Sequence, residues 1–146
     1  MENIKIQRIR QQAQVPKYMS SGAAGADLIA AILTPLVLIP NQATAIPCGF
    51  RMEIPPGFEA QIRPRSGLAL KNNITVANAP GTIDSDYRGE VQVILINLGV
   101  EPYEIQPQDR IAQMVISPVI QAGFELTKEL GESERGEGGF GSTGSQ

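Results

Sequence analysis

The stretch Phe50-Arg51-Met52-Glu53-Ile54-Pro55-Pro56-Gly57-Phe58-Glu59-Ala60-Gln61-Ile62-Arg63 decides the fold class. It contains two short segments with aliphatic residues, separated by Pro-Pro-Gly, and this combination is typical of two strands joined by a turn. The same arrangement recurs along the chain, and no window carries a sustained helical period. We therefore predict an all-β protein.

Proline and glycine interrupt the rest of the chain at similar intervals, with short aliphatic and β-branched segments between them. The strands expected from this pattern are Ile4–Ile9, Ala26–Ala31, Leu36–Ile39, Phe50–Ile54, Phe58–Arg63, Ile74–Ala77, Glu90–Asn97, Tyr103–Ile105, Ile111–Ile116 and Gly123–Leu126. One helical candidate covers Ser66–Lys71, with Ser66 as a candidate N-cap. Many short strands with such turns predict a jelly-roll-like β-barrel or β-sandwich.

The segment Val91-Gln92-Val93-Ile94-Leu95-Ile96 is apolar on both faces apart from Gln92. Two interpretations are about equally supported. Either one face lies in the domain core and the other against a second subunit, or the strand is fully buried in the middle of a monomer.

Composition excludes several classes of protein. The chain has 146 residues, enough for one domain with a core, and a net charge of −3 that cannot neutralise a nucleic-acid backbone. A single cysteine excludes an intrachain disulfide and fits a reducing compartment. No targeting segment is visible, and the most apolar run, Ala30–Pro40, is broken by Pro35 and too short to span a bilayer. We expect a cytoplasmic protein with neither nucleic acid nor membrane as a partner.

The chain contains no histidine. Ser-His-Asp and Cys-His catalysis are therefore excluded, and with one cysteine no zinc site remains. A bound metal must be a hard ion with oxygen ligands, and a general base must be a carboxylate, Lys or Tyr.

The densest polar cluster is Asp84-Ser85-Asp86-Tyr87-Arg88-Gly89, which follows Asn78-Ala79-Pro80-Gly81. Pro80-Gly81 forces a turn, so two carboxylates, a phenol and a guanidinium lie on a compact hairpin with Asn78 beside them. An Asp at such a turn can orient and deprotonate a water molecule. For the cluster alone, the alternative is a solvated turn whose carboxylates only satisfy local backbone groups.

Three further segments carry polar groups. Pro64-Arg65-Ser66-Gly67-Leu68-Ala69 presents a guanidinium, a hydroxyl and free N–H groups to an anion, although an ordinary capped turn would look the same. Asp27 follows a glycine-rich bend, where it either contacts a hydrated cation or caps a turn. Gln113 is the only polar residue in an apolar segment and needs hydrogen-bond partners, which a purely structural role would also explain.

The segment Arg135-Gly136-Glu137-Gly138-Gly139-Phe140-Gly141-Ser142-Thr143-Gly144 has glycine at five of its ten positions, which predicts a mobile arm. Its Arg, hydroxyl and glycine N–H groups suit a phosphate, and Phe140 can lie on a flat ligand. A solvated tail is the commoner outcome for such a composition. We expect a β domain at residues 1–130 and a flexible arm, or lid, at residues 131–146.

Taken in order, five segments resemble the five motifs of the trimeric dUTP pyrophosphatase (dUTPase) family. They are Ala24-Gly25-Ala26-Asp27-Leu28, Pro64-Arg65-Ser66-Gly67-Leu68-Ala69, Gly81-Thr82-Ile83-Asp84-Ser85-Asp86-Tyr87-Arg88-Gly89, Arg110-Ile111-Ala112-Gln113-Met114 and Arg135 to Gly144. The resemblance implies a jelly-roll-like (β-clip) subunit and a homotrimer with active sites at subunit interfaces. It also implies hydrolysis of dUTP to dUMP and pyrophosphate with Mg²⁺ on the triphosphate, which keeps uracil out of DNA and supplies dUMP for thymidylate synthesis.

The resemblance further implies roles for individual residues. Asp84 would activate the water that attacks the α-phosphorus, Tyr87 would pack under the deoxyribose and exclude a 2′-hydroxyl, and Asp27 would contact Mg²⁺ through water. The uracil and deoxyribose site would consist of Asn78, Gly81, Thr82, Ile83, Tyr87 and Phe140, with Phe140 stacked on the base. The phosphate site would consist of Arg65, Ser66, Gly67, Gln113, Arg135, Gly138, Gly139, Ser142 and Thr143.

One position departs from the family pattern, and two other functions are alternatives. Ala26 replaces a residue that is often larger in the family, which loosens a packing contact beside Asp27. A dCTP deaminase-like enzyme would share the fold, but the segment 74–81 at the pyrimidine-binding hairpin contains no Glu. A non-catalytic β-trimer binding module would have no use for Asp84, Tyr87 and the arm together.

Overall fold

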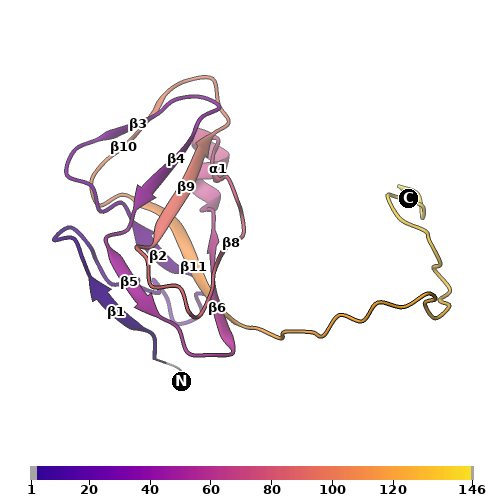
Figure 1. Ribbon diagram of the computed structural model, residues 1–146. Helices are drawn as coiled ribbons and strands as arrows, with labels where there is room; N and C mark the ends of the chain where they lie inside the picture. Colours follow the sequence, from indigo (N-terminus) through magenta and orange to yellow (C-terminus); the bar gives the residue numbers. More distant parts are fainter. Residues whose placement is uncertain (1–2, 146) are drawn as a thin grey trace.

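The computed structural model describes residues 3–145 and is drawn in Figure 1. Within that range it contains eleven strands and one short helix, which confirms the all-β class. The elements are β1 (Lys5–Arg8), β2 (Ala26–Ile29), β3 (Leu36–Leu38), β4 (Ala43–Pro47), β5 (Phe50–Glu53), β6 (Phe58–Arg63), α1 (Ser66–Asn72), β7 (Ile74–Val76), β8 (Gly81–Ile83), β9 (Gln92–Asn97), β10 (Tyr103–Ile105) and β11 (Arg110–Pro118).

The strands form four antiparallel sheets. The orders are β2-β11-β6-β8, β4-β9-β7, β1-β5 and β10-β3. Strands from distant parts of the chain are neighbours, as in the pairs β2 with β11 and β3 with β10. None of the sheets within residues 3–145 closes on itself, so the architecture is a jelly-roll-like sandwich rather than a closed barrel.

The core is built mainly from aliphatic side chains that point inward from alternate strand positions, together with Phe50. Burying one such side chain stabilises the fold by about 1.5–3 kcal/mol. Asn97 is the buried polar residue of the described range, and its amide is fully satisfied. Its Nδ2 donates to the carbonyls of Leu38 (3.0 Å) and Glu101 (2.8 Å), and its Oδ1 accepts from the Gly99 N–H (2.9 Å).

Strand β9 resolves the two interpretations of its apolar faces. Val93 and Leu95 are buried in the core, whereas Gln92 and Ile94 lie on a face that this chain leaves uncovered, with Ile94 37% exposed. The interpretation as a strand fully buried within a monomer is therefore wrong. An uncovered aliphatic face is what a neighbouring subunit can cover.

Three strand expectations differ from the structure. Strands β4 and β8 form where we expected none, because both complete sheets through pairing with distant strands, β9 and β6 respectively. The strand expected at Gly123–Leu126 is wrong: this stretch is exposed and has no partner strand among the described residues. β-Propensity without a neighbouring strand does not form a sheet.

The helix forms at the expected position, but its N-cap is not the expected residue. Helix α1 begins at Ser66, so Arg65 occupies the N-cap position, and no side-chain hydrogen bond caps the helix. The expectation that Ser66 is the N-cap is therefore wrong. At the other end, Asn73 adopts the left-handed conformation (φ 57°), and its N–H bonds to carbonyls of the last turn.

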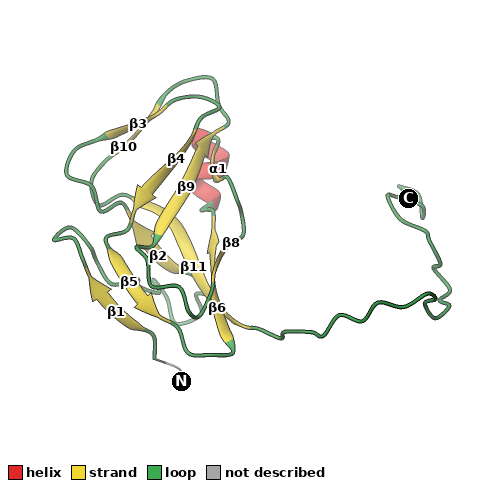
Figure 2. Cartoon of the chain, in the orientation of Figure 1, coloured by secondary structure: helices red, strands yellow, loops and turns green. Residues whose placement is uncertain are grey.

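After Pro118 the chain leaves the sandwich and runs outward as an extended segment that ends in the expected arm, and Figure 2 shows this segment as loop throughout. The side chains of residues 120–137 are exposed, including those of Ile120, Phe124, Leu126 and Leu130. Within residues 3–145, no helix has the length and apolar character needed to cross a membrane.

Candidate active site

Four of the expected base- and sugar-site residues, together with Asp84, border one cavity of about 290 Å³. Its lining residues are Ala45, Asn78, Thr82, Ile83, Asp84, Tyr87, Glu90, Val91, Gln92 and Ile94. Apolar walls with a few converging polar groups are typical of a small-molecule site. Gly81 itself is buried beside this cavity, and a Cβ at Gly81 would lie 3.1 Å from Asn78 Nδ2. The bare glycine thus lets the Asn78 amide lie close to β8.

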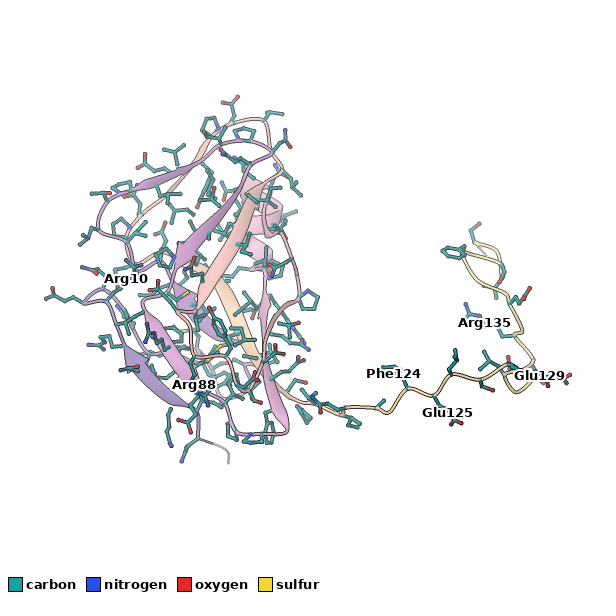
Figure 3. All side chains as sticks on the ribbon, viewed as in Figure 1. Arg10, Arg88, Phe124, Glu125, Glu129 and Arg135 are labelled. Atoms are coloured by element: carbon teal, nitrogen blue, oxygen red, sulfur yellow. The ribbon has the colours of Figure 1, made fainter. Side chains whose placement is uncertain are left out.

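Hydrogen bonds between nearby residues shape the turn that carries Asp84 and Tyr87. The Tyr87 N–H bonds to the Asp84 carbonyl (3.2 Å), and Arg88 Nη1 donates to the carbonyls of Ser85 (2.7 Å) and Tyr87 (3.2 Å). In Figure 3, Arg88 lies on the β domain, far from the labelled residues of the arm. The turn holds the Asp84 side chain exposed at the cavity edge, where a carboxylate can reach water.

Asp84 also borders a second, larger cavity of about 610 Å³. Its lining residues are Pro56, Gly57, Phe58, Glu59, Asp84, Ser85, Asp86, Val119 and Gln121. Three carboxylates line it, and none of the expected base- or phosphate-binding residues does. In the smaller cavity Arg10 neutralises Glu90, which leaves Asp84, within residues 3–145, as its one carboxylate without a guanidinium partner, so this cavity is the better candidate for a nucleotide.

The phosphate-site residues of the β domain gather in a separate cluster. Strand β11 lies between β2 and β6, which places Gln113 opposite Asp27 on one side and Arg63 on the other. Gln113 Nε2 donates to the Pro64 carbonyl (3.1 Å), and a Cβ at Gly25 would collide with Gln113 Oε1. This hydrogen bond satisfies the amide donor that the sequence left without a partner.

Arginines complete this cluster. Arg65 Nη1 donates to the Arg110 carbonyl (2.9 Å), and Arg110 Nη1 lies 3.4 Å from Asp27 Oδ2. Ser66 and Gly67 follow in the exposed first turn of α1. Ala26, beside Asp27, is buried opposite Met114. Two guanidinium groups, a hydroxyl and an amide close together are suited to a phosphate.

The arm residues are far from both clusters in this single chain, as the position of Arg135 in Figure 3 shows. Local turns occupy the segment: Arg135 Nε donates to the Gly138 carbonyl (2.6 Å), and the Ser142 N–H bonds to the Gly139 carbonyl (3.0 Å). Phe140 is fully exposed, with a positive φ of 51°, and Thr143 is exposed as well. The hydrogen bonds of residues 133–144 thus join residues of the arm to one another.

The structure thus places the expected site residues in three separate regions: the hairpin cavity, the cluster on β2, β11 and the start of α1, and the arm. Neither of the two cavities described above is lined by residues of both the hairpin and the phosphate cluster. Residues 3–145 contain no group of three or more His, Cys, Asp and Glu side chains suited to holding a metal ion.

Sequence reasoning missed several residues of the smaller cavity, chiefly Ala45 and Glu90. Glu90 is held by Arg10, whose Nε and Nη2 donate to the two carboxylate oxygens at 2.6 and 2.9 Å. The hydrogen bonds from Arg10 and its positive charge lower the pKa of Glu90, although burial of the carboxylate acts in the opposite direction. In return, the hydrogen bond and charge of Glu90 raise the pKa of Arg10. These partners are 80 residues apart, so no local signal could have paired them.

A jelly-roll-like sandwich with a polar hairpin cavity, an arginine-lined cluster and a glycine-rich arm defines a protein that binds a phosphorylated small molecule. Comparison with known proteins narrows this class. The model of the dUTPase family matches residues 11–144. The deoxyuridine 5′-triphosphate nucleotidohydrolase of Chlamydia pneumoniae is 59% identical over 132 residues, covering 90% of this chain and 91% of the relative. That of Bdellovibrio bacteriovorus is 54% identical over 142 residues, covering 97% and 95%.

Solved structures agree on the fold. A dUTPase variant of Staphylococcus bacteriophage 80alpha, solved with dUpNHpp, superposes with a TM-score of 0.85 at 24% identity, covering 99% of each chain. A dUTPase variant of the S. aureus phage phi11, whose study describes a structural Mg(II) ion, gives a TM-score of 0.79 at 21% identity, covering 88% of this chain and 98% of that one. The chain belongs to the dUTPase family, whose members are dUTP diphosphatase enzymes.

Proposed function

We propose that this protein hydrolyses dUTP to dUMP and pyrophosphate by attack of an Asp84-activated water on the α-phosphorus. The new bond joins the water oxygen to the α-phosphorus, and the bond from that phosphorus to the α,β-bridging oxygen breaks. The proton of the water passes to the Asp84 carboxylate, and pyrophosphate leaves with the electron pair. The observation that carries this proposal is the cavity in which Asp84 lies with Asn78 and Tyr87.

The cavity suits the nucleoside end of dUTP. The Asn78 amide offers both a donor and an acceptor to a uracil edge, and the backbone of Gly81, Thr82 and Ile83 is close enough to help read it. A site built to hydrogen-bond one base rejects others because its polar groups would stay unpaired. Tyr87 would pack under the deoxyribose and leave no room for a 2′-hydroxyl.

The phosphate cluster suits the triphosphate. Arg65, Ser66, Gly67 and Gln113 would neutralise and orient the phosphates, which is the main requirement of phosphoryl transfer. The arm would then close over the substrate. In it Phe140 would stack on uracil, and the groups for the γ-phosphate would be Arg135, Gly138, Gly139, Ser142 and Thr143.

The donor set fits Mg²⁺ that arrives with the substrate. Asp27 is a single carboxylate in the phosphate cluster, and Mg²⁺ is usually held by one or two carboxylates, water and substrate phosphates. Asp27 would hold the ion through water, and the ion would supply charge neutralisation on the triphosphate.

We further infer a homotrimer with active sites between subunits, in the cytoplasm, where the reaction keeps uracil out of DNA and provides dUMP for thymidylate synthesis. Three features support the assembly: the separation of the hairpin cavity from the phosphate cluster, the uncovered face of β9 and the exposed apolar residues of the segment 119–130. Each would be explained by a neighbouring copy that supplies the missing contact.

An isotope experiment tests the chemistry. In H₂¹⁸O with Mg²⁺, we expect wild-type protein to place the label in dUMP and none in pyrophosphate. Asp84→Asn should lower kcat by at least about 10²-fold and retain dUTP binding, because it removes only the base. Asp86→Asn is the matched control, since Asp86 lies on the same turn but outside the smaller cavity. Label in pyrophosphate, or full activity of Asp84→Asn, would contradict the mechanism.

The same assay separates the alternatives through dCTP, dTTP and UTP. We expect no ammonia from dCTP, because Arg10 holds Glu90, the carboxylate that lines the cavity besides Asp84, as an ion pair. Release of ammonia would favour a deaminase, and binding of dUTP without any turnover would favour a binding module.

A further inference from the structure

We propose that Arg10 and Glu90 form a positioning device that fixes the Tyr87 ring and thereby tunes selection of deoxyribose over ribose. The inference rests on the proposed function, because it concerns the sugar end of the same cavity. Arg10 lies outside the five motifs and one residue before the segment that the family model matches.

Tyr87 is tied to the backbone that follows it. Its hydroxyl donates to the Glu90 carbonyl (3.1 Å), so the ring lies across the segment between them. A Cβ at Gly89 would lie 2.5 Å from Tyr87 Cζ and closer still to the hydroxyl. The direction of the ring therefore depends on where the Glu90 backbone lies.

Glu90 in turn is anchored from outside the hairpin. The Arg10 guanidinium grips both carboxylate oxygens, and only 12% of the Glu90 side chain is exposed. A planar two-pronged pair of this kind fixes direction as well as distance. Cutting the pair frees the Glu90 side chain, and the carbonyl that holds Tyr87 belongs to the same residue.

The support on the Arg10 side is rigid. The N–H groups of Ile9 and Arg10 both bond to the Gly49 carbonyl, at 2.9 and 3.1 Å. Gly49 has a positive φ of 78°, and a Cβ there would lie 3.1 Å from that of Arg10. Strand β1 and the loop after it are thus hydrogen-bonded to the residue before β5. Through its ion pair with Glu90, Arg10 connects this fixed backbone to the hairpin.

The test uses Arg10→Met in the full-length protein, because Arg10 is not among the residues that line the cavity and reaches it through Glu90. We expect the ratio of kcat/KM for dUTP to that for UTP to fall roughly tenfold, mainly through better use of UTP. In a Tyr87→Phe background the same substitution should change the ratio by less than about twofold, because the hydrogen bond through which it acts is already gone.

Arg8→Met is the matched control: it removes the same charge from an exposed position on β1, away from the smaller cavity, and should leave the ratio unchanged. If Arg10→Met folds poorly, Arg10→Lys keeps the charge without the planar guanidinium and should give a smaller loss of selectivity.

An unchanged ratio, including an equal loss of kcat/KM for both nucleotides, overturns the inference. Turnover of dUTP by the wild type leaves the proposed function standing in that case. Failure of the wild type to hydrolyse dUTP overturns the proposed function itself.

Discussion

At the scale of single residues, three glycines determine how closely the binding side chains approach the backbone. A Cβ at Gly25 would meet Gln113, one at Gly81 would meet Asn78, and one at Gly89 would meet Tyr87. Each glycine therefore leaves room for the side chain of an expected site residue. The reason for glycine is space, since φ is not positive at any of the three positions.

The Arg10–Glu90 pair predicts an acid-dependent stability. The pKa of Glu90 is lowered from its ordinary value of 4.5 by the Arg10 hydrogen bonds and charge, with smaller help from Gly49 and Arg51. A lowered pKa in the folded state gives stability that is present above pH 4.5 and is lost as pH falls through the folded-state value. We expect Glu90→Gln to lower the free energy of unfolding by about 1 kcal/mol at pH 7 and by progressively less below pH 4.5.

Urea denaturation at fixed protein concentration measures this difference. Glu53→Gln is the control, because Glu53 forms a looser and far more exposed pair with Lys5 at 3.3 Å. A Glu90→Gln penalty that stays constant between pH 7 and pH 3 would contradict the assigned role.

At the scale of elements, we expect the arm to matter for catalytic activity but not for the folding of the strands and the helix. Among residues 3–145, no buried core residue lies beyond Met114. We expect deletion of residues 135–146 to leave a folded protein of unchanged assembly with kcat/KM for dUTP reduced roughly 100-fold, because the arm positions substrate rather than the fold. Deleting only the last two residues is the matched control. Normal turnover by the longer deletion would contradict the lid role.

The strands and the helix also show which parts of the secondary structure could be predicted from local sequence. Most strand positions and the helix were predicted correctly, because proline, glycine and aliphatic residues act within a few positions of themselves. Strand β4 was not predicted, and a strand was wrongly predicted at Gly123–Leu126. Both errors have the same cause. Whether an extended segment becomes a strand depends on a partner that lies elsewhere in the chain.

At the scale of the whole molecule, separate site halves predict complementation between subunits. Asp84→Asn disables the hairpin half and Arg65→Ala the phosphate half. When the two inactive proteins are unfolded and refolded together, we expect about a quarter of the wild-type activity, since a quarter of randomly mixed interfaces combine two intact halves. Mixing two hairpin variants, Asp84→Asn with Tyr87→Ala, should restore nothing.

Light scattering should give three times the chain mass of 15.7 kDa for each of these samples. Absence of complementation in a confirmed trimer would mean that each subunit builds its own site. A monomeric wild type with full activity would contradict the assembly.

The sequence by itself determined the fold class and the family, and it predicted the chemistry of each segment. These properties depend on residue types at short spacing, such as Asp84 and Tyr87 on one turn. Only the tertiary structure decided that Gln113 faces Asp27, that Arg10 grips Glu90 and that Ile94 lies uncovered. Those contacts join residues far apart in the chain, and they exist because strand pairing and burial are satisfied by the molecule as a whole.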